Sequence, residues 1–338
     1  MSFIYNKTTG VNSAAIGKLE TPIRMIIEHE SDLQKKSDDF LKALFNVEKS
    51  SRFGETIIGG NEFDVFKATA EGGRAENDSV RETYKKFIEH IQFMKEFTIT
   101  AEMYEDSING IAANVKGRAE NFTRAYYKTR NQIAQYALAA AAKKQTSGRF
   151  AGALLDLTAQ DGKALFAEDH TYGYEGDTQS NIITKSGAFA DEASLEEALA
   201  EAAVTFRNFK DENGDPLGYT PDTILLRGDD AKVERLAKKV CGTEQASGEG
   251  NYINTQYGGW NVIILPSWLK GADTDASIML MSSEANKNLS GNMFYNRIPL
   301  TINSFVDPHT SDYVWTGRCR FGVGFGNYKH IALLTSGT

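Results

Sequence analysis

The sequence predicts an α+β protein, because three kinds of residue pattern occupy separate stretches of the chain. Residues 100–144 repeat apolar side chains at steps of three and four, which is typical of an amphipathic helix. Residues 54–99 alternate apolar and polar side chains, as strands do. Beyond about residue 150, short apolar runs bounded by proline or polar turns indicate buried strands between helices.

Composition indicates a globular chain and argues against several classes of protein. Of the 338 residues, 41% are hydrophobic and 24% are charged. No apolar run approaches the roughly 20 residues of a membrane span, and the opening residues do not resemble a secretory signal. The two cysteines, Cys241 and Cys319, are too few for a disulfide scaffold, so reduced thiols in a cytoplasm are expected. The net charge of −8 argues against a sequence-specific nucleic-acid reader.

The N-terminal region is expected to be an extended arm followed by a helix. Residues 1–18 are polar and show no period. Pro22 suits the first position of a helix, where its missing N–H costs nothing. The apolar face that follows consists of Ile23, Ile26, Ile27, Leu33, Phe40, Leu41, Leu44 and Phe45.

Residues 54–99 predict a long two-stranded loop. One strand is expected near 61–67, and a second, much longer strand near 83–99, with a polar tip between them. An isolated two-stranded ribbon is marginally stable in water, so we expect the loop to lie against another surface. The charged tip residues, candidates for intersubunit contacts, are Glu71, Arg74, Glu76 and Asp78.

The helix predicted over residues 100–144 is unusually long. Thr100 is the expected N-cap, and Lys143 and Lys144 place positive charge at the C-terminal end, where it complements the helix dipole. At about 1.5 Å per residue the helix would span roughly 65 Å, more than one compact core covers. We therefore expect an extended segment or a second subunit to cover part of it. Its apolar stripe contains Tyr104, Ile108, Ile111, Val115, Ala119, Phe122, Tyr126, Ile133, Ala137 and Ala140.

The region after the long helix predicts a mixed α/β domain. Helices are expected over 195–206 and 229–240, and buried strands over 222–226, 261–265 and 277–281.

The last stretch, residues 298–334, carries alternating strands interrupted by a polar turn. The glycine-rich run 322–326 is interpreted as part of a strand, because no helix follows it as a dinucleotide turn requires. Further candidates for intersubunit contacts, in the polar turn, are Asp307, His309 and Asp312.

The sequence predicts no catalytic, cofactor or metal site. Glu168, Asp169 and His170 form the only dense cluster of metal-type ligands, and a polar loop is the favoured interpretation. Residues 211–215 resemble the start of a calcium loop, but Pro216 stands where that loop needs glycine, so a tight turn is favoured.

Basic residues of the long helix are interpreted as a solvated face, with a DNA-facing or intersubunit role left open. They are Lys116, Arg118, Arg124, Lys128 and Arg130.

The order of elements resembles the major capsid proteins of tailed bacteriophages with the Hong Kong 97-type fold, in details closest to the Mu-type major head subunits. The segments that carry the resemblance are 97–106, where the loop meets the long helix, 164–172, and the two strand regions 219–226 and 260–266. The resemblance implies the fold of a shell subunit with a long spine helix, an extended two-stranded loop, and peripheral and axial domains.

The domain bounds that the resemblance implies are the following. The N-terminal arm and helix occupy 1–53, the extended loop 54–99, the peripheral domain 100–149 and 292–318, and the axial domain 150–291 and 319–338.

The resemblance implies a structural, non-catalytic function, in which the protein assembles into the icosahedral shell that encloses a phage genome. Expected partners are further copies of the chain, as pentamers and hexamers, together with portal and scaffolding proteins and weakly contacted double-stranded DNA, and no membrane is involved. The expected location is the virion, after assembly in the cytoplasm of a bacterial host. Because the chain starts without a long acidic or coiled-coil extension, a separate scaffold or none is expected.

Two alternatives stay open at this stage. An encapsulin-like nanocompartment uses the same fold to hold enzymes, and would contain protein cargo without DNA. A cytoplasmic enzyme with an unrecognised pocket is the alternative from a different class, and a tight stoichiometric small-molecule ligand would indicate it.

Overall fold

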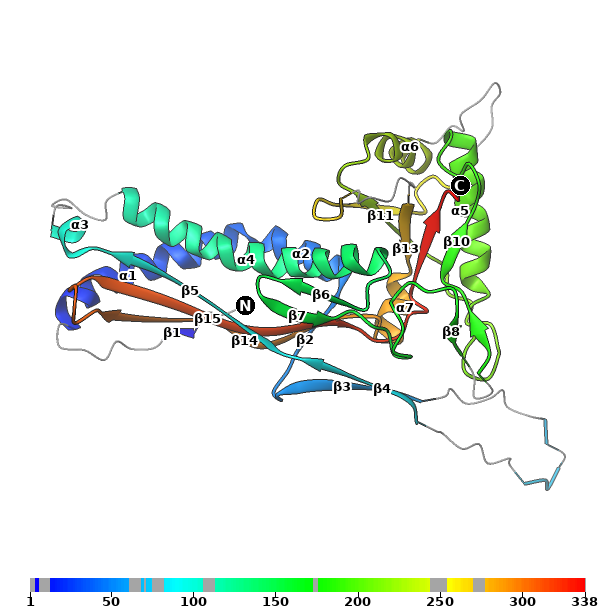
Figure 1. Cartoon of the computed structure of the whole chain (residues 1–338), viewed down its shortest axis with the longest axis horizontal. Coiled ribbons are helices and arrows are strands. Elements are labelled where there is room, and N and C mark those ends of the chain that lie inside the picture. Colours follow the sequence, from blue (N-terminus) through cyan, green and yellow to red (C-terminus); the bar gives the residue numbers. More distant parts are fainter. Residues whose placement is uncertain are drawn as a thin grey trace. The chain divides into compact units, whose positions relative to one another are not determined.

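A computed structural model describes residues 4–5, 13–60, 68–69, 71–74, 82–105, 113–172, 176–243, 254–269 and 277–337 (Figure 1). The chain divides into two compact units. The first contains 1–55, 89–134 and 294–323, and the second contains 56–88, 135–293 and 324–338. Among the helices described, none is long and apolar enough to cross a membrane.

The first unit is built on a five-stranded sheet. Its strands are β1 (Ile4–Tyr5), β2 (Asn46–Lys49), β5 (Ile91–Ile99), β14 (Asn292–Val306) and β15 (Tyr313–Phe325). The order is β1-β14-β15-β5, and β2 also pairs with β14. β5 runs antiparallel to β15 from Ile91 opposite Phe321 to Ile99 opposite Tyr313.

The first unit also contains four helices (Figure 1). They are α1 (Ser13–Leu33), α2 (Lys35–Leu44), α3 (Ala101–Glu105) and most of α4 (Ala113–Ala142). Phe97 of β5 stacks on Trp315 with ring centroids 5.4 Å apart and meets Phe122 of α4 at 5.1 Å. A Cβ atom added to Gly317 of β15 would lie 2.2 Å from the Phe122 ring. The absence of a side chain at Gly317 therefore lets α4 approach the sheet closely.

Three N-terminal expectations are wrong. The expected extended arm over 1–18 is helical from Ser13 onward, and Pro22 lies inside α1 instead of at its first position. The pattern after Pro22 also covers two helices, because α1 ends at Leu33 and α2 begins at Lys35. Ser13, Ala14 and Ala15 explain the earlier start, since alanine is the strongest helix former.

The long helix is partly described. Helix is present over α3 and α4, and residues 106–112 lie outside the described part of the chain. The apolar stripe is confirmed within α4, where Ala119, Ile133 and Ala137 are completely buried.

The second unit contains a mixed sheet whose order is β10-β16-β13-β11-β12. Its strands are β10 (Ile182–Thr184), β11 (Thr223–Arg227), β12 (Asn261–Leu265), β13 (Ser277–Met281) and β16 (Ile331–Thr335). β11 pairs in parallel with β12 and antiparallel with β13. These elements confirm the strands predicted over 222–226, 261–265 and 277–281.

Helices α5 (Glu192–Arg207) and α6 (Ala231–Gly242) cover one face of this sheet and confirm the two predicted helices. Asp191 and Asp230 cap them by accepting hydrogen bonds from the backbone N–H groups of Ser194 and Val233. The shared core is apolar and buried, and includes Leu195, Leu199, Leu236, Ile224 and Leu280.

Smaller elements complete the second unit. β3 (Gly54–Gly60) pairs with β4 (Glu82–Glu89), β6 (Ser147–Phe150) with β7 (Ala153–Asp156), and β8 (His170–Thr171) with β9 (Thr178–Gln179). The short helix α7 (Ser283–Asn288) follows β13.

The single long strand predicted near 83–99 is wrong, because the chain forms two strands that join at His90. β4 pairs with β3, whereas β5 pairs with β15. In β4 the buried residues are Lys86 and Ile88, and Phe87 is 48% exposed. In β4 the even-numbered residues 86 and 88 are buried, whereas in β5 the odd-numbered residues 91, 93, 97 and 99 are partly or fully buried, so the inward face changes at the junction. The strand expected near 61–67 lies outside the described residues.

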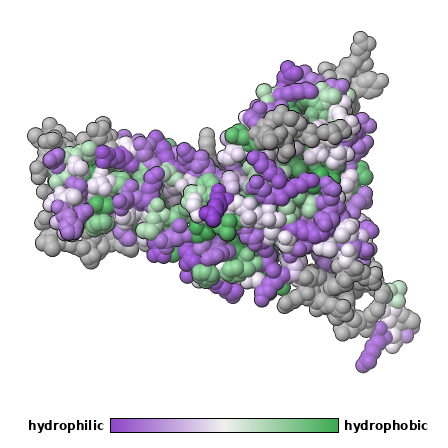
Figure 2. Space-filling model, in the orientation of Figure 1, coloured by the Kyte–Doolittle hydropathy of each residue, from purple (hydrophilic) through white to green (hydrophobic). Residues whose placement is uncertain are grey.

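Apolar side chains occur among the polar ones on the surface (Figure 2). The largest exposures among described apolar residues include Met25 at 65% on α1 and Met94 at 64% on β5. On the β3–β4 ribbon, Ile58 and Phe87 are also exposed. The ribbon thus presents apolar side chains as well as charged ones to its surroundings.

Candidate functional site

The expected contact residues of the loop tip are described only in part. Glu71 and Arg74 are exposed, and Gly72 between them has a φ of 76°, a left-handed backbone that suits glycine. Glu76 and Asp78 lie outside the described residues. The intersubunit contact expected of these tip residues therefore stays a prediction.

In the polar turn between β14 and β15, hydrogen bonds with backbone groups hold Asp307 and Asp312 in place. The N–H of Asp307 donates to the carbonyl of Asp312 at 2.9 Å, and the N–H of His309 donates to Asp307 Oδ1 at 2.9 Å. Asp312 Oδ1 accepts from the N–H of Ala101, the first residue of α3, at 3.2 Å. Asp307 and Asp312 thus build the turn, while the His309 side chain is exposed.

Two ion pairs and a hydroxyl contact join the N-terminal helices to the long helix. Arg124 of α4 donates to Glu30 of α1 at 2.7 Å, and Arg130 pairs with Asp38 of α2 at 2.5 Å. Ser31 and Tyr127 share a hydrogen bond of 2.7 Å. The hydrogen bond from Arg124 holds the pKa of the Glu30 carboxyl below its usual value despite burial.

Arg130 corrects the interpretation of the basic residues as a solvated face. Its side chain is 1% exposed, and its guanidinium lies 5.5 Å from the Tyr126 ring centroid and 5.3 Å from that of Phe294. A planar guanidinium can stack on aromatic faces while it forms an ion pair, which an ammonium does poorly. The helical period alone could not separate this buried cation from its exposed neighbours.

The root of the β3–β4 ribbon contains a buried lysine that the sequence analysis missed. Lys86 of β4 is 6% exposed and pairs with Asp156 of β7 at 2.5 Å, and it also contacts Thr158. Burial raises the pKa of Asp156, but the hydrogen bonds from Lys86 and Thr158 more than offset this, so the pKa lies below its usual value. The ion pair anchors one strand of the ribbon within the second unit.

The cluster Glu168, Asp169 and His170 behaves as a polar loop. Glu168 pairs with Lys144, and Asp169 pairs with Lys163 at 2.8 Å. His170 turns inward, where Nδ1 lies 2.8 Å from Asp161 and the ring stacks on Tyr328. The three side chains therefore have separate partners. Within the described ranges, no three metal-type ligands are close enough to hold an ion.

The tight turn predicted over 211–215 is confirmed. Asp211 Oδ1 accepts from the N–H groups of Asn213 and Asp215, both at 2.8 Å. The carboxylate thus serves the turn itself. The run 322–326 begins in β15, which extends to Phe325, and this confirms the strand interpretation.

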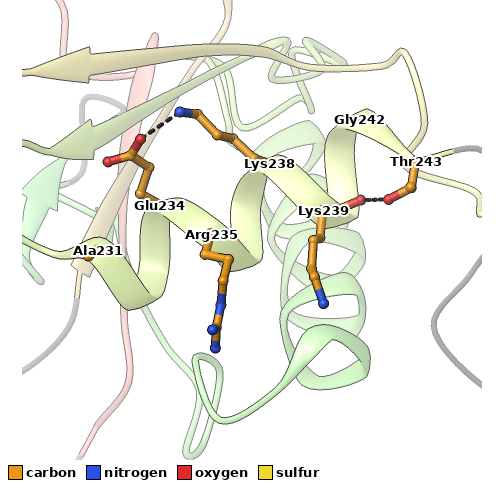
Figure 3. A pocket seen from close by; sticks show the side chains of 7 residues that line it. All are labelled: Ala231, Glu234, Arg235, Lys238, Lys239, Gly242 and Thr243. Atoms are coloured by element: carbon orange, nitrogen blue, oxygen red, sulfur yellow. Dashed lines mark hydrogen bonds and ion pairs between the residues drawn. The ribbon is translucent and has the colours of Figure 1, made fainter.

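A depression of about 450 Å³ lies on α6 (Figure 3). Arg235 and Lys239 extend to the same side of the helix, and Lys238 reaches Glu234 at 2.5 Å. Lys239 also pairs with Glu192 of α5. Three of the charged side chains here, Glu234, Lys238 and Lys239, are thus held in ion pairs.

Comparison with known proteins gives a family match and several structural matches. A family model described as "Phage capsid protein" matches residues 111–334. The chain is similar to the capsid structure of the cyanophage P-SCSP1u, with a TM-score of 0.51, 13% identity and 86% of each chain covered. It is also similar to the capsid of an empty GTA particle, with a TM-score of 0.53, 12% identity, and 88% of this chain and 89% of that chain covered. No curated protein sequence matches. The predicted Hong Kong 97-type fold is thereby confirmed.

Proposed function

Because the chain belongs to the phage capsid protein family, we propose that it is a major capsid subunit whose copies assemble into the icosahedral shell around a phage genome. The single observation that carries this proposal is the family match over 111–334, which includes α4 and almost all of the sheet of the second unit. The particular likeness to Mu-type head subunits stays a prediction.

The two compact units support a division into peripheral and axial domains. We assign the unit with the β14–β15–β5 sheet and α4 to the peripheral domain, and the unit with α5 and α6 to the axial domain. The extended loop corresponds to the β3–β4 ribbon and the segment between its strands. β5, which the sequence analysis placed in the loop, pairs with β15 and so joins the peripheral sheet in this assignment.

The extended loop supplies the proposed contact with a neighbouring subunit. Its root is anchored by the buried Lys86–Asp156 pair, and Ile58 and Phe87 on the ribbon are exposed. The ribbon thus offers exposed apolar side chains on its strands, and the tip offers the exposed charges of Glu71 and Arg74. Protein–protein interfaces combine an apolar centre with a charged rim, so both kinds of side chain suit a contact with a protein surface. The proposed contact residues are Glu71, Arg74, Glu76 and Asp78 at the tip, and Asp307, His309 and Asp312 in the turn between β14 and β15.

Replacing residues 71–78 by a short Gly-Ser turn tests this contact. Folding should be unaffected, because Glu71 and Arg74 are exposed and, besides glycine, the replaced segment has Ala75 as its one apolar residue. Closed particles should then fail to form, or dissociate at a lower temperature than wild type. Particles of normal yield and heat resistance would show that the tip makes no essential contact.

Further partners follow from the same proposal. Copies of the chain would form pentamers and hexamers, and portal and scaffolding proteins would complete the shell in the host cytoplasm. The net charge of −8 supports weak, non-specific contact with packaged double-stranded DNA, because a surface that grips DNA needs excess positive charge.

Light scattering combined with nuclease treatment tests the proposed function. The purified protein, alone or with its companion scaffold, should form large particles, and particles from infected or induced cells should protect DNA from nuclease. Particles that hold protein and no DNA would instead identify a nanocompartment. A monomer that binds one small molecule tightly and never assembles would favour the enzyme alternative.

A further inference from the structure

A buried polar cluster occupies the point where the chain enters and leaves the β3–β4 ribbon. Glu55 is the second residue of β3, and His90 directly follows β4. Ser50, just after β2, lies between them, with its Oγ 2.6 Å from Glu55 Oε1 and 2.7 Å from His90 Nε2. Ser50 is 9% exposed and His90 is 2% exposed. One hydroxyl group thus joins the two ends of the ribbon.

Hydrogen counting assigns the tautomer of His90. An ionised carboxylate only accepts, so the single hydroxyl proton of Ser50 goes to Glu55. His90 Nε2 must then carry a proton and donate it to Ser50 Oγ. The other ring nitrogen, Nδ1, is buried and has no hydrogen-bond partner within the described structure. The geometry therefore fits a neutral imidazole with a bare Nδ1.

Protonation of His90 would oppose this arrangement. The new Nδ1 proton would be a buried donor without an acceptor, which is costly. The backbone carbonyl of His90 already accepts from Arg320 at 3.2 Å. Burial, followed by the positive charge of Arg320, lowers the pKa of His90 below its usual value of 6.5.

The charged groups around His90 include both acidic and basic side chains. The groups that face His90 are Glu55 of β3, Glu89 of β4, the Tyr295 ring and Arg297 of β14, and Arg320 of β15. The two glutamates favour an imidazolium, whereas the two arginines oppose it. The burial of the ring and its unpartnered Nδ1 decide the balance in favour of the neutral form.

We propose that Ser50, Glu55 and His90 form an acid-sensitive latch, which holds the two ends of the β3–β4 ribbon together at neutral pH and releases them when His90 is protonated. The latch is a property of the single chain, and it does not depend on whether particles form. Its consequence is a ribbon whose root is rigid at neutral pH and dynamic in acid.

The size and sign of the effect follow from linkage. A histidine whose pKa is lowered by folding stabilises the folded form above the unfolded pKa, and this stabilisation is lost as the pH falls below 6.5. If His90 stays neutral in the closed latch, the closed-to-open ratio should fall by up to about 30-fold at pH 5, since the open form gains one proton. His90→Gln keeps a side-chain N–H for Ser50 and cannot be protonated in this range.

Hydrogen exchange measured by mass spectrometry on the unassembled protein tests the latch. Peptides that cover 50–57 and 86–91 should lose protection between pH 7.5 and pH 5 after correction for the intrinsic pH dependence of exchange, while peptides from β11 and β13 should not. His90→Gln should abolish the loss. His309→Gln, which alters an exposed histidine, should retain it. A wild-type protein without the loss, or a His90→Gln variant with it, overturns the proposal.

A second measurement needs no variant and so does not depend on the folding of His90→Gln. The slow exchange of the imidazole C2 hydrogen, followed by mass spectrometry on the peptide that contains His90, reports the titration midpoint of that residue. A midpoint below 6.5 supports the latch. A midpoint at or above 6.5 overturns it, because protonation would then not open the root.

Discussion

Removing the negative charge of Asp38 should destabilise the first unit, because Arg130 would lose its counter-charge while it stays buried. Breaking a buried ion pair from one side typically costs about 3–5 kcal/mol. Two aromatic rings remain within 5.5 Å of the guanidinium, and such contacts contribute about 1–2 kcal/mol when desolvated. The Asn oxygen can also still accept a hydrogen bond. For Asp38→Asn we therefore expect a loss of about 2–3 kcal/mol.

Urea unfolding of the unassembled protein measures this loss, and the chain offers a matched control. Asp39 lies on the same helix and its side chain is 73% exposed, 3.7 Å from Lys42. Asp39→Asn should change the free energy of unfolding by less than about 0.5 kcal/mol, as exposed pairs usually do.

Adding Arg130→Met to Asp38→Asn should recover part of the lost stability, because no buried cation then lacks a partner. Equal stability of the Asp38→Asn and Asp39→Asn variants would refute the reasoning, since Arg130 would then need no counter-charge.

Three further predictions concern α4, β15 and α1. In Gly317→Ala, the new Cβ meets the Phe122 ring, so thermal unfolding should show a loss of about 1–3 kcal/mol, whereas Gly117→Ala has open space and should be neutral or stabilising. Ala119→Asp places a carboxylate at a fully buried position, so a loss of several kcal/mol and a low soluble yield are expected, and normal yield and melting temperature would contradict this. Glu30→Gln should be less stable than wild type at neutral pH. The difference should shrink as the pH falls below 4.5, because a carboxyl group whose pKa is lowered by folding stabilises the folded protein only while it is ionised. A difference in urea unfolding that does not change with pH would contradict this.

Periodicity identified the elements in which burial follows a simple repeat. β11 and β13, between Thr223 and Met281, are short apolar runs, and the inward residues of α5 recur at steps of three and four. Local sequence is sufficient in such elements, because the same side chains define the strand or helix and pack its core.

The predictions from sequence were wrong mainly where contacts between residues distant along the chain decide the structure. The break at His90 separates two strands with different partners, because β4 pairs with β3 and β5 pairs with the distant β15. Arg130 is buried only because Asp38 and two aromatic rings surround it, and basic residues on a helix are usually solvated. Proline favours the first position of a helix, which makes Pro22 the expected start, yet α1 begins at Ser13. The contact role of the loop-tip residues Glu71 and Arg74 stays a prediction, because the sequence of one chain does not show what an exposed side chain meets on another copy.

Negative-stain electron microscopy of the purified protein tests the assembly proposal most directly. The protein, alone or with its companion scaffold, should show closed shells of uniform diameter, or rings that convert to shells. A monomer that stays dispersed under every condition, including in the presence of that scaffold, would contradict the proposal that this chain is a major capsid subunit.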